Sequence, residues 1–128
     1  MTHLPTPKAD RLTPQAITLR LEGIAIAALC AAAYGDRGGG WVLFAVLILA
    51  PDIFMLGYVW GNRVGALCYN VGHSYLTPLA LAGAGALTGS DLPVSLALTW
   101  GAHIGLDRGI GYGLKYSSGF KDSHLTRV

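Results

Sequence analysis

The sequence predicts an all-α, polytopic membrane protein: a bundle of four transmembrane helices with both termini in the cytoplasm. Hydrophobic residues make up 52% of the 128 residues and charged residues only 12%, whereas an ordinary soluble domain has about 25% charged residues. The apolar residues fall into four runs, each close to the roughly 20 residues that a helix needs to cross a bilayer. The net charge of +2 is dispersed along the chain, which argues against a nucleic-acid partner.

The first two predicted helices have clear boundaries. The first opens at "LTPQ", where Thr13 can cap a helix and Pro14 suits its first turn, and it ends near Tyr34, before "GDRGGG". The second runs from about residue 41 to residue 60, between two tryptophans. Tryptophans at both ends suit the headgroup depth of a bilayer.

The third and fourth predicted helices contain prolines near turn signals. The third begins after "GNRVG" and continues to about Leu87, and we expect Pro78 to kink it. The fourth follows "TGSDLP", in which Ser90 or Asp91 can cap the helix, and it extends to about Lys115.

Basic residues predict the orientation, because short cytoplasmic loops carry the excess of Lys and Arg. Only Arg37 falls on the predicted outer side. The others precede the first helix, lie between the second and third, or end the chain: Lys8, Arg11, Arg20, Arg63, Arg108, Lys115, Lys121 and Arg127. We therefore expect a membrane domain over residues 14–115, flanked by cytoplasmic tails over residues 1–13 and 116–128.

The fourth predicted helix carries small residues at a spacing of four, which lets another helix approach closely. These residues are Gly101, Gly105, Gly109 and Gly113. His103 and Asp107 project from roughly the opposite side of the same helix. Both faces call for protein neighbours, so we expect this helix to be the most enclosed. The glycine stripe equally fits a homodimer.

Several polar side chains interrupt the apolar runs, and each ionisable one costs about 3 kcal/mol or more at bilayer depth unless it has a partner. They are Glu22, Asp52, Asn70, His73, Ser74, Thr77, His103, Asp107 and Arg108. Counting 1.5 Å per residue from the cytoplasmic ends places Asp52 and His73 at roughly 13 Å, His103 at about 16 Å and Asp107 at about 10 Å. These four residues are therefore expected to converge.

Two imidazoles and two carboxylates at one depth form a plausible ligand set for a divalent metal ion, zinc above all, with Asn70 or water completing it. Asp52 or Asp107 could then assist proton transfer in a membrane-embedded hydrolase. The same groups also fit a proton, cation or solute transporter. They fit equally well a buried polar cluster that only fixes helix packing or binds a partner, with Arg108 paired to Glu22 or Asp52.

The chain resembles the domain of unknown function 4260 family, small bacterial proteins with four predicted membrane helices. The resemblance covers about residues 20–125, through "RLEG", "GWVLFAVLILAPDIFMLGYVWG", "VGALCYNVGHSYLTPLAL" and "AHIGLDRGIGYGLKYSSGFKDSHL". It implies a multi-pass protein of the bacterial inner (cytoplasmic) membrane, in contact with lipid, and assigns no activity.

The order "PD", "HS" and "HxxxD" is also similar, more loosely, to YdjM-type predicted membrane-bound metal-dependent hydrolases. That likeness implies ligand roles for Asp52, His73, His103 and Asp107. The chain departs from the "HRxxxHS"-type motif, because Asn70 stands three positions before His73 in "YNVGHS". This departure puts a second metal ion, and hydrolase activity itself, in doubt.

Overall fold

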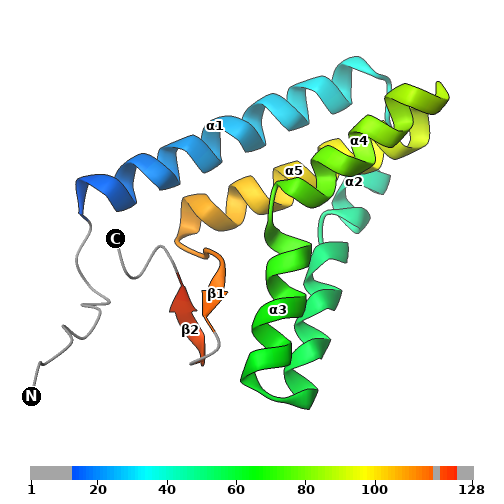
Figure 1. Cartoon of the computed structure of the whole chain (residues 1–128). Coiled ribbons are helices and arrows are strands. Elements are labelled where there is room, and N and C mark those ends of the chain that lie inside the picture. Colours follow the sequence, from blue (N-terminus) through cyan, green and yellow to red (C-terminus); the bar gives the residue numbers. More distant parts are fainter. Residues whose placement is uncertain (1–12, 117–118, 124–128) are drawn as a thin grey trace, which may run out of the picture.

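The computed structural model describes residues 13–116 and 119–123, most of them helical (Figure 1). The helical elements are α1 (Pro14–Asp36), α2 (Trp41–Leu47), the 3-10 helix η1 (Ala50–Trp60), α3 (Asn62–His73), α4 (Leu76–Thr88) and α5 (Asp91–Ile110). A two-stranded antiparallel hairpin, β1 (Lys115–Tyr116) and β2 (Gly119–Ser123), follows α5 and lies beside α3. The all-α class is confirmed, and the hairpin is a feature that the sequence analysis did not predict.

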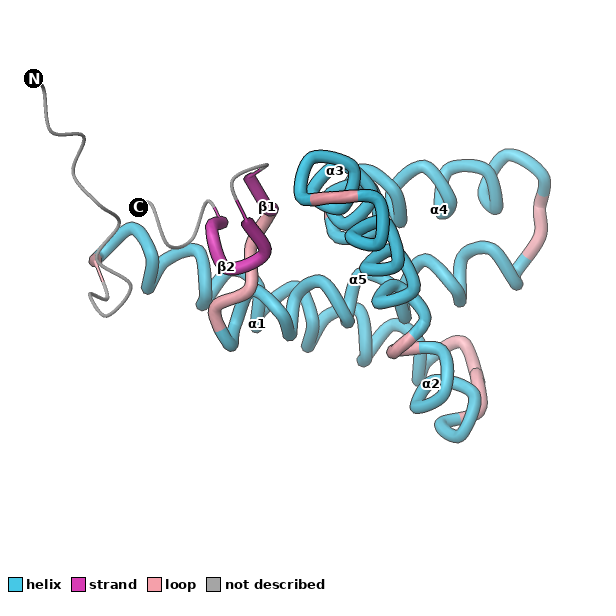
Figure 2. The backbone as a smooth tube through the Cα atoms, turned by 90° about the horizontal axis from the view of Figure 1, so that it is seen from below, coloured by secondary structure: helices cyan, strands magenta, loops and turns pink. Residues whose placement is uncertain are grey.

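The helices form a layer and an arm. In the layer, α5 lies between α1 and α4 and contacts both (Figure 2). In the arm, η1 and α3 pack side by side and cross the layer at a large angle (Figure 1). The buried residues of α5 include Ala97, Thr99, Gly101, Ala102, His103, Ile104, Gly105 and Arg108, more than any other described helix has. The prediction that this helix is the most enclosed is therefore confirmed for the part of the chain that the structure describes.

Helix α1 starts where the sequence predicted. The hydroxyl of Thr13 accepts a hydrogen bond from the backbone N–H of Ala16 at 3.1 Å, and Pro14 occupies the first turn. At the far end, the side chain of Arg37 forms a 2.7 Å ion pair with Asp91, just before α5 enters the layer. The loop after α1 and the loop before α5 therefore lie at the same end of the layer.

The predicted boundaries of the other three segments are partly wrong. The second segment changes from α-helix to 3-10 helix before Pro51, because a proline cannot donate to the preceding turn. The third segment breaks at Ser74 and Tyr75, and Pro78 lies in the first turn of α4, where it is tolerated. The fourth ends at Ile110 instead of Lys115, and Gly111 closes it with a φ of +105°. Among the described residues, the four predicted segments therefore divide into six helical elements.

Large apolar side chains lie on the outside of the molecule and small ones lie inside. Leu29 is 72% exposed, Val42 81% and Leu87 90%, whereas the buried apolar residues are mainly alanines. Two helical stretches, Pro14–Asp36 and Trp41–Trp60, are long and apolar enough to cross a membrane. An apolar exterior around a core of small and polar residues is typical of helices that pack within lipid.

Glycines allow the helices to approach closely. A Cβ at Gly105 would collide with the carbonyl oxygen of Gly23 and the backbone of Ala27, both on α1. Gly101 and Gly109 also face α1, through Cys30 and Ile24. Three members of the predicted glycine stripe thus pack against α1 within one chain, and the homodimer through this stripe remains a prediction.

We predict that Gly105→Leu destabilises the protein by about 1 to 3 kcal/mol or more, because the new side chain must separate α1 from α5. The midpoint of thermal unfolding in detergent, followed by circular dichroism, measures the effect. Gly83→Ala is the matched control, because a Cβ at Gly83 in α4 meets open space. An unchanged midpoint for Gly105→Leu would contradict the close α1–α5 packing.

Candidate metal centre

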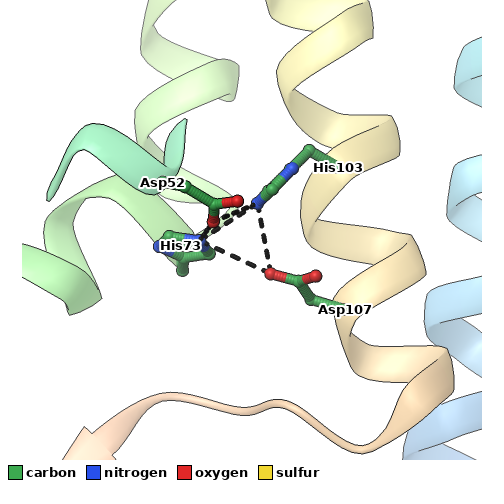
Figure 3. Close-up of side chains that lie close together, drawn as sticks. All are labelled: Asp52, His73, His103 and Asp107. Atoms are coloured by element: carbon green, nitrogen blue, oxygen red, sulfur yellow. Dashed lines mark hydrogen bonds and ion pairs between the residues drawn. The ribbon is translucent and has the colours of Figure 1, made fainter. Parts of the chain in front are cut away.

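Four ionisable side chains meet where the arm joins α5 (Figure 3). Nε2 of His73 lies 3.1 Å from Nε2 of His103, 3.2 Å from Oδ1 of Asp52 and 3.4 Å from Oδ2 of Asp107. Nε2 of His103 lies 3.1 Å from the same Asp52 oxygen and 3.2 Å from the same Asp107 oxygen. All four ligand atoms fall within 4.8 Å of one another. The convergence of these residues is therefore confirmed.

Each side chain is placed by a distinct local feature. Asp52 stands in the first turn of η1, directly after Pro51. His73 is the last residue of α3, so its imidazole projects at the break before α4. His103 and Asp107 lie one turn apart on α5 and face the arm together. Two ligands therefore come from the arm and two from the layer.

The cluster is buried on one side and open on the other. The side chains of His73 and His103 are only 3% and 7% exposed, and that of Asp107 is 19% exposed. The Asp52 side chain is 43% exposed. The cluster is therefore most exposed at Asp52.

Hydrogen bonds to the backbone orient both imidazole rings. Nδ1 of His73 lies 3.0 Å from the Tyr69 carbonyl oxygen and donates to it, and the Tyr69 ring stacks on the His73 ring at 3.8 Å between centroids. The His103 ring is hydrogen-bonded to the backbone of Ile48. Because Nε2 of each ring points into the cluster, both rings present a lone pair there in their neutral form.

The cluster therefore consists of four hydrogen-bond acceptors when both imidazoles are neutral: two ring nitrogens and two carboxylate oxygens. Four acceptors this close repel one another unless a cation or added protons lie between them. A metal ion satisfies all four at once. A tetrahedral zinc ion with bonds of 2.0 to 2.1 Å requires its ligand atoms to be about 3.3 Å apart. Five of the six pairs of ligand atoms lie 3.1 to 3.4 Å apart, and all four atoms lie within 4.8 Å of one another. The residues present could therefore hold a divalent metal ion.

The break between α3 and α4 is held by side chains that cap the end of α3. Its last carbonyls lack the partners that a continuing helix would provide. The indole N–H of Trp100 donates to the Gly72 carbonyl at 2.6 Å, and Nη2 of Arg108 donates to the His73 carbonyl at 3.1 Å. The Thr77 hydroxyl donates to the Val71 carbonyl. Trp100 and Arg108 flank the two ligands of α5, so these bonds also fix α5 relative to His73.

The supporting polar residues lie around the cluster. Arg108 is buried and donates to the His73 carbonyl. Asn70 lines a separate cavity with Ser74 and Thr77. Glu22 lies on the exposed side of α1. The bond from Arg108 to the backbone was not among the sequence-based expectations, and the pairing of Arg108 with a carboxylate remains a prediction.

The sequence analysis missed two residues that support the cluster, Tyr69 and Trp100. Tyr69 stands four positions before His73 on α3, and this spacing could have indicated a bond between the ring nitrogen and its carbonyl. No sequence signal pairs Trp100 with Gly72, because that bond depends on how the arm meets α5.

A family model described as "Domain of unknown function (DUF4260)" matches residues 16–128. The chain therefore belongs to this family. No curated protein and no solved structure matches it. The looser likeness to YdjM-type hydrolases is not supported by any match.

We predict that the purified protein retains about one zinc ion per chain and that His73→Ala and His103→Ala each weaken zinc binding by on the order of 100-fold or more, because each removes a ligand. Elemental analysis and competition with a chromogenic chelator measure both quantities. Glu22→Gln is the control, since Glu22 is a carboxylate outside the cluster. Equal metal content in the wild type and both alanine variants would refute the site.

Proposed function

We propose that this protein is a multi-pass integral membrane protein of the bacterial inner membrane that hydrolyses an ester or phosphoester with a zinc ion held by Asp52, His73, His103 and Asp107. The observation that carries the proposal is the convergence of four acceptor atoms on one point, with both imidazoles oriented by the backbone. Metal-ligating histidines characteristically donate their second ring N–H in this way.

The donor set favours catalysis over a purely structural role. Structural zinc sites are mainly built from cysteines and closed to solvent, whereas catalytic sites combine histidine with a carboxylate and keep a position that water can enter. Both described cysteines, Cys30 and Cys68, are free and stand outside the cluster. Asp52, with its side chain 43% exposed, is the ligand that water can displace.

Once bound, a zinc ion supplies a water molecule of lowered pKa and polarises the ester oxygen. Asp52 can accept the proton of the attacking water and return it to the leaving alkoxide oxygen. Asp107 stays beside His103 as a ligand, because it is the more buried carboxylate. Arg108 and Trp100 hold the end of α3 and thereby keep His73 in place.

We predict that Asp52→Asn retains zinc but lowers turnover by about 100-fold or more, because it removes the general base, whereas Asp107→Asn loses zinc as well. The assay presents fluorogenic ester and phosphodiester amphiphiles in mixed micelles and is paired with elemental analysis of each variant. Proton or cation flux in liposomes without turnover would contradict the hydrolase and support a transporter. Loss of thermal stability alone in both variants would support a structural cluster.

Membrane insertion with cytoplasmic termini is supported by the apolar exterior and by the Arg37–Asp91 ion pair, which joins two loops at one end of the layer. We predict that a membrane-impermeant maleimide labels Arg37→Cys from the outer side, because the positive-inside rule leaves only this basic residue there. Lys8→Cys, Arg63→Cys and Lys121→Cys should react only after the membrane is opened. Labelling of position 37 solely from the cytoplasmic side would reverse the orientation.

A further inference from the structure

A mostly apolar cavity that contains two charged residues lies between the first half of α1 and the last turn of α5. Its volume is about 200 Å³. Leu19, Glu22, Gly23 and Ile26 of α1 line one wall, and Tyr75, Arg108 and Leu114 line the other. Residues 52, 73, 103 and 107 do not line it, so it is distinct from the cluster.

Arg108 gives this cavity a fixed positive charge. The residue is only 8% exposed, and its guanidinium lies over the Tyr75 ring at 5.6 Å from the centroid. Its bond to the His73 carbonyl anchors the guanidinium at the cavity wall. A guanidinium carries five N–H donors in a planar fork that matches the oxygens of a phosphate. The inner end of the cavity therefore suits a phosphate group.

Glu22 gives the mouth of the same cavity a negative charge. Its neighbours Leu21 and Ile24 are exposed apolar residues, so this face of α1 is made for lipid. Within residues 13–116 and 119–123, no ion pair reaches Glu22. An exposed carboxylate at this face attracts positively charged groups. The mouth of the cavity therefore suits a cationic group.

We propose that this cavity binds a phosphoethanolamine headgroup, with the phosphate at Arg108 and the ammonium at Glu22. A lipid that carries this headgroup, phosphatidylethanolamine, would lay its acyl chains along Leu19 and Ile26 on the apolar face of α1. The start of α1 and the end of α5 lie near each other (Figure 1), and most of the lining residues belong to these two parts of the chain. In the proposed orientation this is the cytoplasmic headgroup level. The inference goes beyond the proposed hydrolase and does not depend on it.

Native mass spectrometry of the full chain in detergent, with equal amounts of phosphatidylethanolamine and phosphatidylglycerol added, tests the proposal. The wild type should retain phosphatidylethanolamine at least about tenfold better, since one charge-assisted contact corresponds to roughly this factor. Glu22→Gln should abolish the preference while leaving zinc content and unfolding temperature unchanged. Asp36→Asn is the matched control, because it removes a carboxylate at the other end of α1.

Two further experiments complete the test. Ile26→Trp should lower retention of both lipids by filling the cavity, and it leaves every charged residue in place. Displacement of the lipid by soluble phosphoethanolamine would assign the site to the free compound, whereas continued retention would assign it to the membrane lipid. An unchanged lipid preference in Glu22→Gln, or equal retention of both lipids by the wild type, would overturn the proposal.

Discussion

The arrangement depends on the break between α3 and α4 and on the hydrogen bonds that compensate for it. A helix that ends in an apolar environment leaves carbonyl groups without donors, and each such group costs free energy unless another part of the protein supplies one. Trp100 and Arg108 of α5 supply two donors, to Gly72 and His73. The bonds that permit the break therefore also dock α5 against the end of α3, which places His103 and Asp107 opposite His73.

Glycines at the helix contacts bring the backbones close enough for the side chains of the cluster to meet. Aspartate is short, so its carboxylate reaches a shared point only if the backbones that carry the ligands lie near one another. Gly72 of α3 allows the Phe54 side chain of η1 to pack against α3. In the other direction, Gly57 of η1 allows the Cys68 side chain of α3 to pack against η1. On the other side, Gly23 and Gly105 bring α1 into contact with α5. Small residues inside and large apolar residues outside thus suit the membrane protein that we propose, in which polar side chains meet inside and apolar ones face lipid.

The sequence was sufficient to predict which residues would meet, because depth along a helix follows from counting residues. Asp52, His73, His103 and Asp107 converge although the second and third segments bend. The bends themselves were misplaced: Pro78 marked a plausible kink, yet the break precedes it at Ser74, where donors from α5 are available. The bond from Arg108 to the His73 carbonyl was not predicted. Local signals predict helix caps such as Thr13, but they do not encode bonds between elements distant in the chain.

The position of the cluster explains why a metal ion would matter to the fold as well as to chemistry. Asp52 and His73 belong to the arm, and His103 and Asp107 belong to the layer, so a bound ion would join the two parts. A ligand that binds only the folded arrangement stabilises it by mass action. The capping bonds from Trp100 and Arg108 hold the same junction from the protein side. A bound ion and the caps would therefore act on the same junction between the arm and the layer, where the caps hold the end of α3 that carries His73.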